Sequence, residues 1–271
     1  MGLVLNTNIA SLNTQRAVSK TQGAMGQAME RLSSGLRVNS AKDDAAGLAI
    51  GTRMEGQIRG LNVATRNAND GVSMVQVADG ALSTIGDMML RMRELAVQAS
   101  NGSYADNGTD LAALDAEYQS LATGIADMAS QTKFNGLAII AGDAATFSLQ
   151  IGANNGDTFD ITTTDASAYT VTGDLNTTAG AATAITTLDT ALDTLNTDRG
   201  AYGAALNTLD FTVKNLQNAA ENQAAAKSRI MDADYSAETA ALSKAQVLQQ
   251  AGVAMLAQAN QQPQQILSLL R

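Results

Sequence analysis

Histidine and cysteine are both absent from this 271-residue sequence, which also has no tryptophan and a single proline. The chain therefore has no thiol nucleophile, disulfide, Cys/His metal site or imidazole general base. Carboxylate chemistry remains possible, since Asp and Glu total 26, but most of these residues lie singly on predicted helices, where solvated charges are the ordinary explanation. We expect no enzyme, no catalytic residues, no metal site and no cofactor.

Aromatic residues make up only 3% of the sequence, so we do not expect a large globular core built on rings. The net charge is −9, and the lysines and arginines are dispersed rather than clustered. Nucleic acid binding needs a basic face, so no nucleic acid partner is expected. An apolar run of about 18 to 20 residues is also absent, so we expect no membrane insertion.

The first residues lack the basic start and apolar run of a cleaved secretory signal, since the first positive charge is Arg16. Asn6 stands where a myristoylation motif needs Ser or Thr. Taken alone, these signals would indicate a cytoplasmic protein.

Two distant stretches, 43–101 and 185–230, carry apolar residues at alternating spacings of three and four, the heptad pattern of a coiled coil. We interpret them as a long antiparallel pair of helices; several short helices in a compact bundle are the alternative. The glycines between 47 and 86 favour the alternative, since each weakens a helix interior by about 1 kcal/mol, but small residues also permit close helix approach. The predicted rod seam consists of Ile58, Leu61, Val72, Val75, Leu82, Ile85, Leu188, Leu192, Leu195, Leu206, Leu209, Val213 and Leu216.

Both ends of the chain have the pattern of amphipathic helices. A single amphipathic helix has nothing of its own to cover its apolar side, so we expect the two ends to pair. We also expect them to be loose in a free monomer and ordered only against neighbouring copies. The predicted terminal packing residues are Leu5, Ile9, Leu12, Val18, Met25, Met29, Leu32, Leu242, Leu248, Met255, Leu256, Leu269 and Leu270.

Between the long stretches we predict a short helix over 111–131 and then a β-hairpin region over 134–173. Apolar residues alternate with polar ones on both sides of Asn154-Asn155-Gly156, a strong hairpin signal. Residues 137–141 and 169–172 are further strand candidates. The predicted fold class is mainly α: a long antiparallel helical coiled-coil rod with a small β-hairpin subregion and paired N- and C-terminal segments.

Several motifs resemble those of bacterial flagellin, in order and over nearly the full length. The most specific are Glu30-Arg31-Leu32-Ser33-Ser34-Gly35-Leu36-Arg37 and Asn39-Ser40-Ala41-Lys42-Asp43-Asp44-Ala45-Ala46-Gly47; the others are at 5–13, 91–98, 131–136, 254–261 and 267–271. The chain is identified as a member of that family, in a short form without the variable outer domains.

This resemblance implies a structural subunit that self-assembles into the bacterial flagellar filament for swimming motility. It implies an extracellular protein, secreted without a cleaved signal peptide and exported unfolded by the flagellar type III apparatus, which reverses the cytoplasmic interpretation. The terminal helix pair, 1–42 and 232–271, would form the inner filament tube. The rod domain, 43–231, would form the outer tube with a long helix 43–101 and a return helix 180–230.

The partners implied are copies of the same chain, an export chaperone, the filament cap and hook-junction proteins. The family's motif for the flagellin-sensing Toll-like receptor matches Arg91, Leu95 and Glu117, which adds an innate immune receptor; solvated charges and core packing are the alternative explanation. The alternative functions are a hook–filament junction protein, a secreted enzyme on a flagellin scaffold and a free-standing coiled-coil adaptor.

Overall fold

The computed structural model describes residues 7–141, 146–165, 169 and 173–269, with the side chains of 262–269 excepted. The helices in this part of the chain are α1 (Ile9–Ser34), α2 (Ala45–Ala99), α3 (Thr109–Gln131), α4 (Thr178–Met231) and α5 (Tyr235–Leu269). The strands are β1 (Lys133–Phe134), β2 (Leu137–Ala138), β3 (Thr146–Gln150) and β4 (Thr158–Thr162). The predicted fold class, mainly α with long helices and a small β-hairpin, is confirmed.

The chain divides into two compact units. The terminal unit combines Met1–Gly56 with Asn222–Arg271, and the central unit is Gln57–Glu221. The first turns of α2 and the last turns of α4 thus belong to the terminal unit. The boundaries expected from the filament layers, 42/43 and 231/232, stay a prediction. No helix in the described ranges combines the length and apolar character that a bilayer crossing requires.

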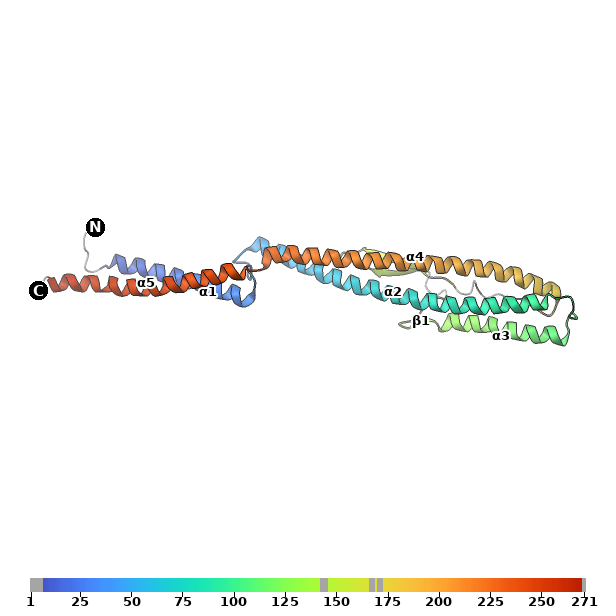
Figure 1. The fold of residues 1–271 in the computed structure, drawn as a ribbon. Coiled ribbons are helices and arrows are strands. Elements are labelled where there is room, and N and C mark those ends of the chain that lie inside the picture. Colours follow the sequence, from blue (N-terminus) through green and yellow to red (C-terminus); the bar gives the residue numbers. More distant parts are fainter. Residues whose placement is uncertain (1–6, 142–145, 166–168, 170–172, 270–271) are drawn as a thin grey trace. The chain divides into compact units, whose positions relative to one another are not determined.

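In the central unit, α2, α3 and α4 lie side by side (Figure 1) around a core to which all three contribute. Leu82 of α2, Ile125 of α3 and Leu188 of α4 are all completely buried. The structure buries Leu61, Val75, Leu82, Ile85, Leu188, Leu195, Leu209 and Leu216 of the predicted rod seam, and half-buries Ile58, Val72, Leu192, Leu206 and Val213.

Ion pairs across α2 and α4 show that the two helices run antiparallel. Asp79 lies 2.8 Å from Arg199, and further along α2 Arg93 lies 2.6 Å from Asp189. Because all four side chains are partly exposed, the pairs contribute little stability. They show which residues of α2 and α4 lie opposite each other, an alignment that the buried apolar seam determines.

Two separate hairpins follow α3. Strands β3 and β4 pair antiparallel, with Phe147 opposite Ile161. Strands β1 and β2 form a sheet of their own, because Asn135 and Gly136 both adopt positive φ (49° and 83°), as a two-residue hairpin turn requires. Of the strand candidate 137–141, Leu137 and Ala138 form β2, and Ala141 makes an isolated antiparallel bridge to Asp165, just after β4. In the other candidate, 170–172 lie outside the described residues.

Two glycines of α2 let this larger hairpin approach the helix closely. A Cβ at Gly60 would lie 2.9 Å from Cβ of Ala153 in the turn, and one at Gly71 would overlap the Leu149 side chain of β3. In this helix, these glycines serve packing despite their cost in helix propensity.

In the terminal unit, α1 and α5 lie side by side (Figure 1). Helix α1 begins after Asn8, whose side chain accepts a hydrogen bond from the Ser11 N–H, and it ends at Gly35 in the left-handed conformation (φ 71°). The chain then turns so that Arg37 N–H donates to the Met231 carbonyl at 2.7 Å. This contact joins the end of α1 to the end of α4.

Candidate functional site

The contact between α1 and α5 buries few side chains. Among the described side chains of these two helices, Ser11, Ala28 and Ala245 alone are buried. All three are small, so the helices approach closely without a row of large apolar residues between them. This pair has much less apolar burial than the central unit.

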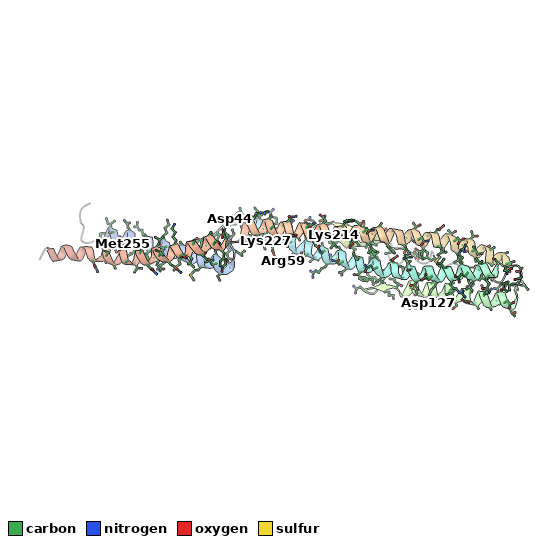
Figure 2. All side chains as sticks on the ribbon, in the orientation of Figure 1. Asp44, Arg59, Asp127, Lys214, Lys227 and Met255 are labelled. Atoms are coloured by element: carbon green, nitrogen blue, oxygen red, sulfur yellow. The ribbon has the colours of Figure 1, made fainter. Side chains whose placement is uncertain are left out.

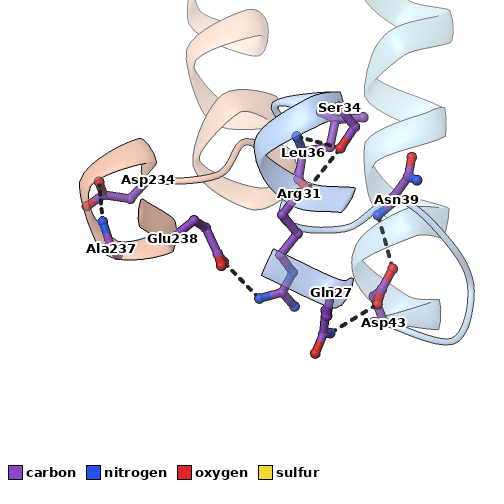
Figure 3. Close-up of polar contacts among 9 residues, drawn as sticks. All are labelled: Gln27, Arg31, Ser34, Leu36, Asn39, Asp43, Asp234, Ala237 and Glu238. Atoms are coloured by element: carbon purple, nitrogen blue, oxygen red, sulfur yellow. Dashed lines mark hydrogen bonds and ion pairs between the residues drawn. The ribbon is translucent and has the colours of Figure 1, made fainter. Parts of the chain in front are cut away.

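Polar contacts hold the pair together at both of its ends. At one end, Asn8 Nδ2 donates to the Ala259 carbonyl at 2.7 Å, and Ser11 Oγ donates to Asn260 Oδ1 at 2.8 Å. At the other end, the guanidinium of Arg31 lies 2.9 Å from the carboxylate of Glu238 (Figure 3). These contacts fix the direction and register of the helices and add little apolar burial.

The large apolar side chains of the pair are exposed instead. The exposed fraction is 58% for Ile9 and 56% for Met29 on α1, and 65% for Val247 and 59% for Met255 on α5. Of the predicted terminal packing residues, the structure leaves Ile9, Leu12, Met29, Leu248 and Met255 exposed and half-buries Val18, Met25, Leu32, Leu242 and Leu256. Leu5, Leu269 and Leu270 lie outside the residues whose side chains are described.

Two exposed valines of α5, Val247 and Val253, were not predicted. Val247 lies on another side of the helix from the stripe through Leu242 and Leu248, whereas Val253 lies about three turns after Leu242, at the edge of that stripe. The signal was present in the sequence, because the apolar residues of α5 exceed what a single stripe can hold.

A groove of about 420 Å³ runs between the two helices. Its walls include Val18 of α1 and Leu248 and Met255 of α5, and its lining is mostly apolar; Figure 2 labels Met255 on α5. At Gly252, on the same wall, an added Cβ would lie 2.7 Å from Val18 Cγ2. The groove is an apolar recess of the size that inserted side chains would fill.

The segment between α1 and α2 is ordered by its own polar contacts. The Asp43 carboxylate accepts hydrogen bonds from the N–H and hydroxyl of Ser40, both at 3.0 Å, and from the Asn39 N–H at 3.3 Å (Figure 3 shows the last). The hydrogen bonds from Ser40 chiefly lower the pKa of Asp43, because they favour the charged form. Gln27 of α1 donates to the same carboxylate at 3.5 Å, so this segment is tied to the helix pair.

Of the receptor-motif residues, the structure brings Arg91 and Glu117 together on the surface. Arg91 Nε and Nη2 donate to Glu117 Oε1 at 3.0 and 2.9 Å, and this contact, followed by one to Glu94, raises the pKa of Arg91. Leu95 is only 1% exposed and packs in the core of the central unit. The three residues therefore do not share one surface.

The exposed apolar side chains of α1 and α5 suit association with another protein surface rather than catalysis. Completely burying a large apolar side chain contributes about 1.5–3 kcal/mol, so several such residues on two helices can drive binding. Among the described residues, no group of acidic side chains is arranged to hold a metal ion.

Comparison with known proteins gives matches along nearly the whole chain. Residues 5–145 match the model of the bacterial flagellin N-terminal helical region, and residues 185–270 match that of the C-terminal helical region. The flagellin of Halalkalibacterium halodurans is 43% identical over 274 residues, which cover 99% of this chain and 100% of the relative. The flagellin of Bacillus subtilis is 40% identical, covering 98% and 99%. The crystal structure of Bacillus cereus flagellin is 37% identical and has a TM-score of 0.51. The match covers 60% of this chain and 94% of the Bacillus cereus chain.

Proposed function

The chain belongs to the bacterial flagellin family and is a structural subunit of the flagellar filament, and we propose that it polymerises by burying the exposed faces of α1 and α5 against neighbouring copies. The observation that carries this mechanism is the contrast between the two units. The central unit buries its own apolar seam, whereas the terminal helices leave Ile9, Met29 and Met255 more than half exposed.

In this proposal, the terminal helices form the inner tube of the filament and the central helices form the outer tube. Because a free copy gains little from its own α1–α5 contact, ordering of these helices is coupled to addition at a growing end. The same weakness keeps the free chain from holding a stable, fully packed terminal core before assembly.

The filament lies outside the cell, and we propose that this chain reaches it unfolded through the flagellar type III apparatus. An export chaperone, the filament cap and the hook-junction proteins would be its further partners, as the family resemblance implies. The role of this chain is structural rather than catalytic. A hook–filament junction function is not favoured, because the matches to the flagellins of Halalkalibacterium halodurans and Bacillus subtilis cover at least 98% of this chain and at least 99% of each relative.

Two substitutions on α5 test the mechanism without touching a buried residue. We expect Leu248→Gln combined with Val253→Gln to raise the critical concentration for polymerisation by at least about tenfold, since each side chain would lose about 1.5 kcal/mol or more of apolar burial. Sedimentation of polymer measures that concentration. The control is Lys244→Gln, an exposed polar position on the same helix, which should polymerise like the parent chain.

Circular dichroism should show the same helix content for the double variant and the parent, which separates an assembly defect from misfolding. An unchanged critical concentration in a correctly folded double variant would mean that neither Leu248 nor Val253 of α5 is buried in the contact between copies.

We also propose that an innate immune receptor of the Toll-like class recognises the exposed Arg91–Glu117 pair, while Leu95 contributes only by packing inside the unit. We expect Arg91→Ala to lower the response of receptor-expressing reporter cells to the monomer. The matched control is Arg93→Ala, which removes a partly exposed arginine of the same helix that pairs with Asp189 instead. Equal responses to both variants and to the parent would remove Arg91 from the recognition surface.

A further inference from the structure

The sulfur atoms of this protein are distributed unevenly between the inside and the surface. The sequence has 11 methionines and no cysteine, so every sulfur is a thioether. Met89 and Met92 are completely buried, and Met74 and Met231 are almost completely buried. Among the described residues, two methionines are exposed: Met29 at 56% and Met255 at 59%.

Both exposed methionines lie on the terminal helix pair, Met29 on α1 and Met255 on α5. We propose that they are oxidation sites at which a peroxide, by forming methionine sulfoxide, prevents an unassembled chain from joining the polymer. This inference rests on the proposed mechanism of assembly, and it adds a chemical control on the same surface.

The reaction needs only the thioether and the peroxide. The sulfur lone pair attacks one peroxide oxygen, the O–O bond breaks, and that oxygen stays on sulfur as the sulfoxide. The other oxygen leaves as water after taking up the proton. Sulfur is oxidised by two electrons and hydrogen peroxide is reduced by two, so no further reactant is required. A methionine sulfoxide reductase can reverse the change.

Oxidation of Met29 or Met255 makes polar a part of the α1–α5 surface that is proposed to be buried against a neighbouring copy. Met255 lines the mostly apolar groove between α1 and α5 together with Val18 and Leu248. Of the polar residues in the same lining, Thr14 and Thr21 already donate their hydroxyl hydrogens to carbonyls of α1, which leaves the Asn13 amide as the remaining side-chain donor. A sulfoxide oxygen is a strong acceptor, and burying it without a donor is unfavourable. Oxidised Met29 would bring the same cost to the neighbouring copy that covers α1.

The buried methionines give the inference its selectivity. Met89 and Met92 lie in the core of the central unit, out of reach of dissolved peroxide while the unit is folded. Oxidation of a folded monomer should therefore spare Met89 and Met92 and the core packing that they provide. In the filament, the two terminal sulfur atoms become buried as well, so assembled copies should be protected.

Peptide mass spectrometry after limited hydrogen peroxide treatment tests the reactivity. In the monomer, we expect the peptides with Met29 and Met255 to gain one oxygen each, while those with Met89 and Met92 stay unmodified. In filaments under the same treatment, oxidation at Met29 and Met255 should be at least about tenfold slower, because their sulfur atoms are covered. Equal rates in monomer and filament, or faster oxidation of the buried pair, would overturn the proposal.

Sedimentation of treated monomers tests the consequence for assembly. We expect the oxidised parent to have a critical concentration about tenfold higher or more, and Met29→Leu combined with Met255→Leu to assemble equally well before and after treatment. Leucine keeps the apolar volume and helix propensity but has no sulfur. The control, Met54→Leu combined with Met88→Leu at two half-buried positions, should remain as sensitive as the parent.

Normal assembly of the parent with both sulfoxides present, or full sensitivity of the Met29/Met255 leucine variant, would overturn the inference. Failure of the untreated parent to polymerise would count against the proposed assembly mechanism instead. In that case the monomer mass spectra still test whether Met29 and Met255 are the reactive methionines. The proposed effect of their oxidation on assembly would be rejected together with the assembly mechanism.

Discussion

Tyr118 is fully buried in the core of the central unit, and its hydroxyl has no hydrogen-bond partner among the described residues. Gly173 lies against it, since a Cβ there would be 2.9 Å from the hydroxyl oxygen. Removal from water raises the pKa of Tyr118 to about 12, with the nearby charge of Asp115 adding to the effect. The core therefore accommodates the neutral ring and disfavours the phenolate.

We expect Tyr118→Phe to leave stability near pH 7 unchanged or raised, because it removes a buried polar group without a partner. The alkaline behaviour should differ. The pKa of Tyr118 in the folded protein is above the ordinary value of 10.0, so the folded state favours the neutral phenol. The free energy of unfolding is therefore highest below pH 10 and falls as the pH rises towards about 12, because the unfolded chain ionises first. Thermal melts followed by circular dichroism near pH 7 and about pH 11 should show a smaller fall for Tyr118→Phe than for the parent. Equal falls would mean that the folded core does not raise the pKa of Tyr118 above its value in the unfolded chain.

Leu95 shows how a single residue can be placed from the sequence. The apolar stripe of α2 through Met89 and Met92 continues three residues later to Leu95, and the structure buries all three. The heptad pattern thus predicts an inward side chain, whereas the resemblance to a receptor motif says only that the residue type matches. The Arg91–Glu117 pair joins two helices, so spacing along one helix could not predict it.

At the scale of elements, the long helices could be predicted because their apolar spacing persists for many turns. The small sheet β1–β2 was missed although Asn135-Gly136 is a hairpin signal of the same kind as Asn155-Gly156. The short strands around it have too few residues for alternation to show. The pairing of α1 with α5 was predicted, but the residues buried in their contact were not, because periodicity identifies large apolar residues, while the side chains buried there are small.

The glycines of α2 serve different purposes, and this leads to a matched prediction. Gly80 has nothing within 4 Å of an added Cβ, whereas Gly60 lies against the backbone and side chain of Ala153. We expect Gly80→Ala to raise the free energy of unfolding by about 0.5–1 kcal/mol through helix propensity. Gly60→Ala should lose that gain or reverse it, because the hairpin has to move away. Denaturant unfolding measures both, and an equal rise for both variants would contradict the close approach of hairpin and helix.

At the scale of the whole molecule, the two units differ in how far each is complete by itself. The central unit covers its seam with three helices and a hairpin. The terminal unit has polar contacts at the two ends of α1–α5, a mostly apolar groove, and large apolar side chains facing outward. The composition suits both units, because the chain has no histidine or cysteine but has many aliphatic residues of the kind that helical interfaces bury.

Hydrogen–deuterium exchange, read by mass spectrometry on the dilute monomer and on sedimented filaments, tests this difference most directly. We predict fast exchange over 9–34 and 235–261 in the monomer and strong protection of both in the filament, with 61–99 protected in both states. Terminal helices already as protected in the dilute monomer as 61–99 would contradict the claim that neighbouring copies complete them.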